Sequence, residues 1–310
     1  MRGKVLVTPR SITREGHPAL DRLRQAGLEV ITCTPDKQPT EEQLLSLLPG
    51  CVAMLAGVER ISARVLEAAA AKGLKVIARN GIGTDNVDLA AARRLGVRVE
   101  RAADANSRGV AELTMAAMLA MARSLVFHDG RLKAGKWDRL KGFELEGKTL
   151  GLIGCGQVGK LVAKLSLGMG MKVLAYDPAA DATFAPGPGF AFASMDRLVG
   201  ESDVISLHCP PSPDGRPLVD AAFLAAAKDG AMLINTARAS LLDEPAVLAA
   251  LDSGRLAGLA TDVFAAEPPP PGPLLEHPRV LATPHVGGYT TESVDRAVSA
   301  AVDAILACLK

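Results

Sequence analysis

Short runs rich in β-branched residues alternate with Ala-rich and Leu-rich runs along the whole chain of 310 residues. Strand-length runs that alternate with helical runs build parallel sheets with helices on their faces. The pattern therefore predicts an α/β fold made of doubly wound parallel sheets. At about 100–200 residues per domain, the length predicts two domains.

The alternation falls into two series. The first series predicts strands over 4–8, 29–33, 52–56, 74–78 and 97–99, and it ends near Glu100. A long amphipathic helix is predicted over 107–125, and a polar stretch follows over 128–145. The second series begins at Thr149 and predicts six strands, over 149–153, 172–176, 204–208, 232–235, 258–262 and 280–282. Helical spacing of apolar residues predicts a last helix over 291–306.

The charge balance and the cysteines indicate which partners and which compartment to expect. The chain has 35 Lys and Arg against 34 Asp and Glu, which gives no electrostatic footprint for nucleic acid or an anionic membrane. We therefore expect a small-molecule partner, with no nucleic acid and no membrane. The five cysteines are scattered and form no C-x-x-C pair, so neither a disulfide framework nor a bound metal is indicated. A cytoplasmic location is expected, because that compartment keeps thiols reduced.

A glycine motif opens the second series. Gly154, Gly156 and Gly159 form G-x-G-x-x-G between an apolar strand and a helix, which is the order that a dinucleotide site requires. Gly154 allows the tight turn, Gly156 lets the backbone approach a pyrophosphate, and Gly159 allows close helix–strand contact. The pyrophosphate would lie at the helix N-terminus, where unpaired N–H groups and the helix dipole favour an anion.

Asp177 ends the next strand, 18 positions after Gly159. An acid at this point hydrogen-bonds the adenosine ribose hydroxyls and repels a 2′-phosphate. No Lys or Arg follows in the sequence until Arg197. The spacing therefore predicts NAD as the cofactor in preference to NADP.

Three further segments follow predicted strands, where open α/β sheets bind ligands. They are NTAR, which ends at Arg238, DVFAAEP, which contains Glu267, and TPHVGG, which contains His285. An Arg fork suits a carboxylate, and a His with an unperturbed pKa of about 6.5 can move a proton in both directions. A carboxylate beside that His would fix its tautomer. These residue types predict a carboxylate clamp and an acid–base pair.

With these segments, the sequence resembles the NAD-dependent D-2-hydroxyacid dehydrogenases, and within them the phosphoglycerate dehydrogenase-like branch. The resemblance also rests on GIGTDNVD beginning at Gly81, on Asn106-Ser107, and on AELT beginning at Ala111. It implies that Arg238, Glu267 and His285 are catalytic, and that Ile82, Gly83 and Arg238 bind the substrate. It implies cofactor contacts from Gly154, Gly156, Gln157, Val158, Gly159, Asp177, Cys209, Pro210, Thr236, Asp262 and Gly288.

The family architecture implies a discontinuous substrate domain, which periodicity alone would not show. A flavodoxin-like domain would comprise 1–103 plus 286–310, with a Rossmann NAD-binding domain inserted over 104–285. By the same resemblance, the Ala-rich segment over 107–125 is expected to form a homodimer through the cofactor domains.

The implied function is hydride transfer between NAD and C2 of a small D-2-hydroxy acid or its 2-oxo acid. One alternative is 3-phosphoglycerate dehydrogenase specifically, although Ala56-Gly57-Val58 stands where the serine-pathway enzymes carry an Arg. Arg60 and Arg79 are nearby alternatives for binding a phosphate. Glyoxylate, hydroxypyruvate, lactate and glycerate are the smaller candidates. Another alternative is an NAD(H)-sensing, corepressor-like binding protein on the same fold. Glu267 argues against formate dehydrogenase, whose catalytic His is partnered by Gln.

Overall fold

The computed structural model describes residues 3–35 and 37–310 and divides the chain into two compact units. Unit 1 is Met1–Asn106 with Gly288–Lys310, and unit 2 is Ser107–Gly287. The boundaries lie two or three residues beyond those expected from the sequence. Ser107 already begins a helix of unit 2, and the Gly287 N–H donates to Asp262 at 2.8 Å, which keeps both residues in that unit.

Unit 1 is built on a parallel sheet of five strands in the order β2-β1-β3-β4-β5. This is the flavodoxin-like doubly wound order. The strands are β1 (Lys4–Val7), β2 (Glu29–Thr32), β3 (Cys51–Ala56), β4 (Val76–Arg79) and β5 (Arg98–Arg101).

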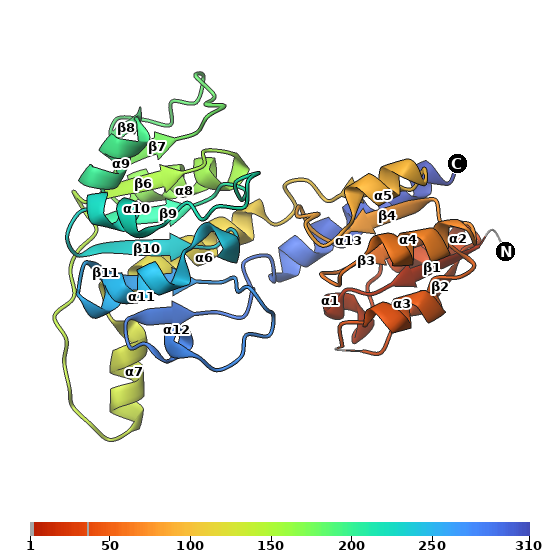
Figure 1. Ribbon diagram of the computed structural model, residues 1–310, viewed down its shortest axis with the longest axis horizontal. Helices are drawn as coiled ribbons and strands as arrows, with labels where there is room; N and C mark the ends of the chain where they lie inside the picture. The colour runs from red at the N-terminus through yellow and green to blue at the C-terminus, as the bar shows by residue number, and fades with distance from the viewer. Residues whose placement is uncertain (1–2, 36) are drawn as a thin grey trace. The chain divides into compact units, whose positions relative to one another are not determined.

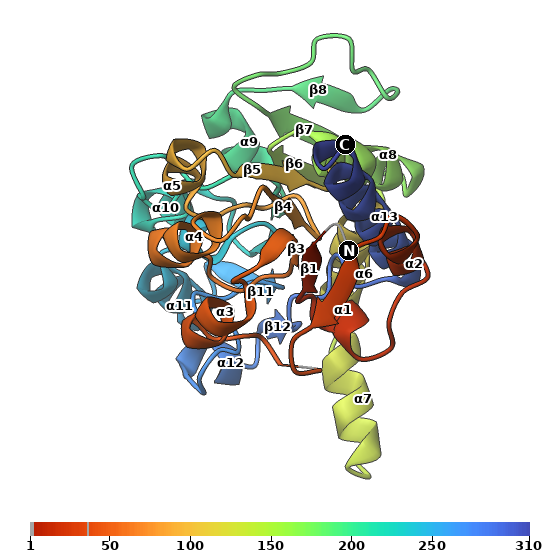
Figure 2. The ribbon, with the colours of Figure 1, turned by 90° about the vertical axis from the view of Figure 1, so that its right-hand side faces the viewer.

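Helices cover both faces of the unit 1 sheet (Figure 2). One face carries α3 (Glu41–Leu47), α4 (Ala63–Ala70) and α5 (Leu89–Arg94). The other carries α1 (Arg10–Thr13), α2 (Leu20–Gln25) and the C-terminal helix α13 (Thr291–Cys308). Val298 and Val302 of α13 are fully buried with Val5 and Val76 of the sheet. The last helix therefore completes the core that the first hundred residues begin.

Unit 2 is built on a parallel sheet of seven strands in the order β12-β11-β10-β9-β6-β7-β8. The strands are β6 (Thr149–Ile153), β7 (Lys172–Tyr176), β8 (Phe190–Phe192), β9 (Val204–Leu207), β10 (Ala231–Asn235), β11 (Leu256–Thr261) and β12 (Val280–Ala282). The strand order reverses between β6 and β9, and this switch point is where doubly wound sheets bind ligands. The fold class is thereby confirmed. The sequence missed β8, a three-residue edge strand with too few residues to show a period.

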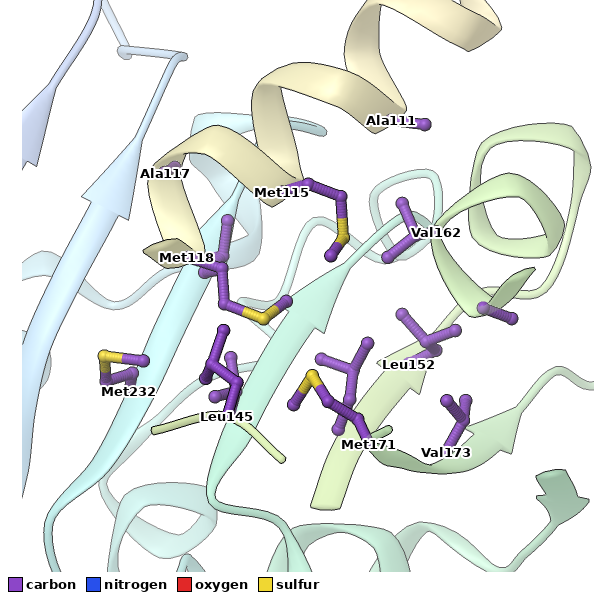
Figure 3. Packing of buried hydrophobic residues seen from close by; sticks show 14 of the residues in the cluster. Ala111, Met115, Ala117, Met118, Leu145, Leu152, Val162, Met171, Val173 and Met232 are labelled. Carbon is purple, nitrogen blue, oxygen red and sulfur yellow. The ribbon is translucent and has the colours of Figure 1, made fainter. Parts of the chain in front are cut away.

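The helices of unit 2 lie on both faces of its sheet (Figure 1). They are α6 (Ser107–Ala122), α7 (Leu125–Lys133), α8 (Gln157–Gly168), α9 (Met195–Glu201), α10 (Ala221–Ala226), α11 (Glu244–Asp252) and α12 (Pro273–Glu276), with a short 3-10 helix η1 (Ala239–Leu241). Met115 and Met118 of α6 point into the core towards Leu145 and Met171 (Figure 3). Methionine side chains are unbranched and flexible, so they can fill irregular gaps between the helix and the sheet.

The predicted helix over 107–125 is broken. Ser124 has a φ of +48°, so α6 ends at Ala122 and α7 starts in a new direction at Leu125. The predicted polar stretch over 128–145 therefore begins inside α7, which stands out from the body of unit 2 (Figure 1). In residues 3–35 and 37–310, no single helix is long and apolar enough to cross a membrane, although the bent pair α6 and α7 passes on length and composition.

Candidate active site

The loop between β6 and α8 carries the three glycines of the dinucleotide motif. Gly154 has a φ of +97°, and a Cβ there would lie 2.5 Å from the His208 carbonyl carbon. A Cβ at Gly159 would lie 2.2 Å from the Gly154 carbonyl oxygen, so both positions require glycine. By contrast, a Cβ at Gly156 would meet no protein atom within 4 Å. The space beside Gly156 is therefore open for a pyrophosphate at the N-terminus of α8, which fits a bound dinucleotide.

Asp177 follows β7 and is tied to the glycine loop. Its Oδ2 accepts a hydrogen bond from the Cys155 N–H at 2.8 Å, and its Oδ1 accepts one from the Ala179 N–H at 2.8 Å. Each carboxylate oxygen has a second lone pair, so Asp177 retains acceptor capacity for hydroxyl groups. The acid thus lies beside the glycine loop, where a ribose acid is needed.

The other predicted cofactor residues lie on several elements. In unit 2, the structure places them at the start of α8, after β9, after β10 and after β11: Gln157, Val158, Cys209, Pro210, Thr236 and Asp262. The Thr236 hydroxyl lies 3.2 Å from the Thr114 hydroxyl of α6. Gly288 instead belongs to unit 1, where a Cβ would lie 2.9 Å from the Asn106 Nδ2.

His285, in the loop after β12, contacts Glu267, in the loop after β11. The His285 Nδ1 lies 2.9 Å from Glu267 Oε1 and 2.8 Å from Oε2. Because an ionised carboxylate only accepts hydrogen bonds, we assign the proton of the neutral imidazole to Nδ1. Nε2, across the ring, is then the proton acceptor.

Each partner shifts the pKa of the other. The hydrogen bond to Glu267 is the largest influence on His285 and raises its pKa above the ordinary value, against the opposing effect of burial. For Glu267, burial is the largest single influence and acts to raise the pKa. The hydrogen bond and charge of His285, with smaller contributions from the Phe264 N–H and Arg238, outweigh it, so the pKa of Glu267 lies below its ordinary value. The pair therefore favours a charged carboxylate beside an imidazole that gains protons readily.

Asp262 holds the loop that carries His285. His285 has a φ of +55°, a strained conformation for a residue other than glycine that persists only when its surroundings impose it. Asp262 is 2% exposed, and its Oδ1 accepts from the Val286 N–H at 2.8 Å and the Thr283 hydroxyl at 2.6 Å. Its Oδ2 accepts from the Gly287 N–H at 2.8 Å. The buried acid thus fixes the chain on both sides of His285.

Arg238 follows β10 and is held by the last residue of that strand. The Asn235 Nδ2 donates to the Arg238 carbonyl at 2.8 Å, and the Asn235 Oδ1 accepts from the Ala237 N–H at 3.0 Å. The charge of Arg238 lowers the pKa of both His285 and Glu267. The structure therefore brings the three ionisable residues from three strand ends into one electrostatic environment.

Ile82 and Gly83 lie in unit 1, half-buried in the loop after β4. Arg79, 5% exposed at the end of β4, donates from Nε to the Gly83 carbonyl and from Nη1 to the Ala56 carbonyl, each at 2.9 Å. A buried guanidinium therefore links this loop to the end of β3.

Sequence reasoning missed two features of the site in unit 2. The first is the anchoring role of Asp262, for which the only signal was its place at the end of a predicted strand. The second is an ion pair between Lys160 and Asp181, whose Nζ and Oδ2 lie 2.6 Å apart. The two residues stand 21 positions apart, and no local pattern connects them.

The chain is similar to known proteins of one family. A family model described as D-isomer specific 2-hydroxyacid dehydrogenase, NAD binding domain, matches residues 115–287. The hydroxypyruvate reductase of Thermotoga maritima is 41% identical over 262 residues, which cover 83% of this chain and 84% of the relative. The D-3-phosphoglycerate dehydrogenase of Archaeoglobus fulgidus is 39% identical over 279 residues, which cover 89% of this chain and 52% of the relative.

This chain spans about half the length of the phosphoglycerate dehydrogenases that it matches. Among solved structures, a crystal structure of a protein from Thermus thermophilus superposes with a TM-score of 0.89 at 39% identity, covering 99% of this chain and 96% of that one. The resemblance expected from the sequence is confirmed, as is NAD as the cofactor. The chain belongs to the D-isomer-specific 2-hydroxyacid dehydrogenases, enzymes that use NAD to transfer a hydride to or from C2 of a small 2-hydroxy or 2-oxo acid.

Proposed function

We propose that His285 is the general acid and base of the reaction and that Glu267 positions and polarises it. Bound NAD supplies the hydride acceptor, and NADH the hydride donor, for C2 of the substrate. The Nε2 of His285 takes up the hydroxyl proton during oxidation and returns it during reduction. This assignment depends on one observation: His285 Nδ1 lies 2.8 and 2.9 Å from the two Glu267 oxygens. The contact fixes the orientation of the ring, so that Nε2 is the nitrogen available for proton transfer.

We assign the substrate carboxylate to Arg238. Its planar guanidinium can bind a carboxylate through two parallel hydrogen bonds and can polarise the neighbouring carbonyl of a 2-oxo acid. The N–H groups of Ile82 and Gly83 are proposed as further donors on the basis of the family resemblance. The cofactor contacts of the glycine loop, Asp177, Cys209, Pro210, Thr236, Asp262 and Gly288 are proposed on the same basis.

The substrate we propose is a small unphosphorylated 2-oxo acid, such as hydroxypyruvate or glyoxylate. A phosphate needs cations, and the loop after β3 begins with Gly57 and Val58 and then buries an acid, Glu59, which is 1% exposed. The cation of this loop, Arg60, comes after that acid and is exposed to solvent. Glu59 Oε1 accepts hydrogen bonds from the Thr8 hydroxyl and from the Gly57 N–H. At the end of the neighbouring strand β4, the buried Arg79 guanidinium donates hydrogen bonds to two backbone carbonyls of the protein. These hydrogen bonds compete with binding of a substrate phosphate.

The direct test is a substrate screen. NADH consumption would be followed with hydroxypyruvate, glyoxylate, pyruvate and phosphohydroxypyruvate at matched concentrations. We expect kcat/KM for hydroxypyruvate or glyoxylate to exceed that for phosphohydroxypyruvate. A preference for the phosphorylated acid would establish the phosphoglycerate alternative, and NADH binding without consumption would indicate a sensor.

We also propose a homodimer, formed around α7. Within the segment over 107–125 that was expected to form the dimer, Ala111, Met115 and Met118 of α6 are buried in the core of unit 2. In unit 2, exposed large apolar residues include Leu119 of α6 and a group on α7 and just after it: Leu125, Val126, Phe127, Leu132, Trp137 and Leu140. Contiguous exposed apolar surface marks interaction sites. Sedimentation at micromolar concentration should give a dimer that Val126→Glu with Trp137→Glu dissociates, and a wild-type monomer would rule the dimer out.

We further propose that the protein works in the cytoplasm without a nucleic acid or membrane partner. All five cysteines are free, which suits a reducing compartment, and the formal net charge is +1. Fractionation of cells that express the protein, together with a nucleic-acid retention assay, would test both points.

A further inference from the structure

The first turn of α8 and the loop after β7 are joined by an ion pair that the proposed chemistry does not use. The Lys160 Nζ lies 2.6 Å from the Asp181 Oδ2. Lys160 stands in the first turn of the helix that the glycine loop opens, and Asp181 stands four positions after Asp177. The ion pair therefore belongs to the two segments that border the proposed ribose site.

Asp181 is fixed by its own turn as well as by Lys160. Its Oδ1 accepts hydrogen bonds from the Thr183 N–H at 3.0 Å and from the Thr183 hydroxyl at 2.6 Å. The hydrogen bond from Lys160, followed by those from Thr183, lowers the pKa of Asp181 to about 2. Lys160 is thus partnered by a carboxylate that stays charged throughout the working pH range.

Lys160 is engaged from other directions too. Its Nζ lies 5.3 Å from the centroid of the Phe184 ring, a distance that allows a cation–π contact. The charge of Asp177 also acts on the same ammonium group. Lys160 therefore lies within electrostatic range of both acids, although the sequence between Asp177 and Arg197 contains no cation.

We propose that Asp181 is a second determinant of the preference for NAD, and that Lys160 is a latent phosphate-binding cation that Asp181 masks. NADP differs from NAD by a phosphate on the adenosine 2′ oxygen, which the Asp177 carboxylate repels. The Lys160 ammonium could offer this phosphate a charge-assisted hydrogen bond, and the Asp181 carboxylate competes for it. A second ammonium group, that of Lys164, lies 5.9 Å from the same Phe184 ring, whereas the ion pair of Asp181 is with Lys160. Discrimination is then shared between one acid that faces the ribose and a second acid that neutralises the neighbouring cation. This inference rests on the proposed placement of the ribose beside Asp177.

The test compares two nucleotides that differ only by the 2′-phosphate, adenosine 2′,5′-bisphosphate and AMP. Calorimetric titration of the full chain gives the ratio of their affinities without relying on turnover. Asp181→Asn keeps an oxygen for the Thr183 turn but removes the charge, and we expect it to shift the ratio about three- to fivefold towards the bisphosphate. Asp177→Asn should shift it in the same direction, and the double variant should exceed either single one.

The matched control is Lys160→Gln in the Asp181→Asn background, which should abolish the gain. Asp181→Ser, which also removes the charge, should shift the ratio in the same direction as Asp181→Asn. A ratio that changes less than about twofold in both Asp181 variants, with a double variant that does not exceed Asp177→Asn, would overturn the proposal. So would a gain that survives Lys160→Gln, because the added affinity would then not come from Lys160. If Asp177→Asn itself leaves the ratio unchanged, the ribose placement is wrong and the inference fails with it.

Discussion

Both units present loops at the carboxyl ends of parallel strands, but they use buried charge differently. In unit 1, Arg79 and Glu59 are almost fully buried, and both form hydrogen bonds with backbone groups. In unit 2, Asp262 does the same for the loop of His285, yet the His285 side chain keeps 43% of its surface exposed. Buried charges therefore fix loop shape in both units. We propose that unit 2 adds an accessible titratable group, His285, whose pKa the hydrogen bond to Glu267 raises.

The largest effect is expected where that accessible group is removed. His285→Ala should lower kcat by about 10²–10⁴-fold, because the proton then has no positioned acceptor. Steady-state kinetics would measure this, with His277→Ala as the matched control. A His285→Ala enzyme that keeps more than about a tenth of wild-type kcat would show that the accessible group is not the acid and base.

The second effect concerns the carboxylate clamp. Arg238→Lys keeps the charge but loses the planar fork, so kcat/KM should fall by about 10- to 150-fold, the value of a charged hydrogen bond. KM should rise and kcat should fall, since the clamp acts on both the bound substrate and the transition state. Kinetics with unchanged KM would place the substrate carboxylate elsewhere.

A smaller effect is expected where the buried acid of unit 2 loses its charge. Asp262→Asn exchanges one acceptor oxygen for an NH₂ group that would face a backbone N–H or a hydroxyl. The free energy of unfolding should fall by about 1–3 kcal/mol, and kcat should fall with it because the His285 loop loosens. Denaturant unfolding and kinetics on the same sample would check both. If the variant is less stable but keeps the wild-type kcat, Asp262 stabilises the fold and its hold on the His285 loop is not needed for catalysis.

The smallest effect is expected from the matched change in unit 1. Glu59→Gln retains an acceptor for the Gly57 N–H, so the free energy of unfolding should fall by only about 1 kcal/mol. The pH at which activity changes should stay where it is in the wild type, because the hydrogen bonds of Glu59 go to Thr8 and Gly57 of its own unit. A displaced pH profile would mean that the two units share their electrostatics.

The sequence predicted the parts of the site that depend on local chain geometry. The glycine loop and Asp177 follow from the order of strand, turn and helix, and family resemblance brought Arg238, Glu267 and His285 together. The break at Ser124 was missed because apolar spacing continues through it. The Lys160–Asp181 pair and the hydrogen bonds of Asp262 were missed because they depend on how segments distant in the sequence meet, which periodicity does not report.

The pairing of His285 with Glu267 is tested most directly by the pH profile of Glu267→Gln. Glu267 raises the pKa of His285, so a neutral amide in its place should lower that pKa. Reduction needs protonated His285 and loses rate as pH rises through the pKa, so the fall in kcat/KM should begin at lower pH in the variant. Oxidation needs neutral His285, so its rise should also move to lower pH. A Glu267→Gln profile that overlays the wild type in both directions would contradict the pairing, even if the variant is slow.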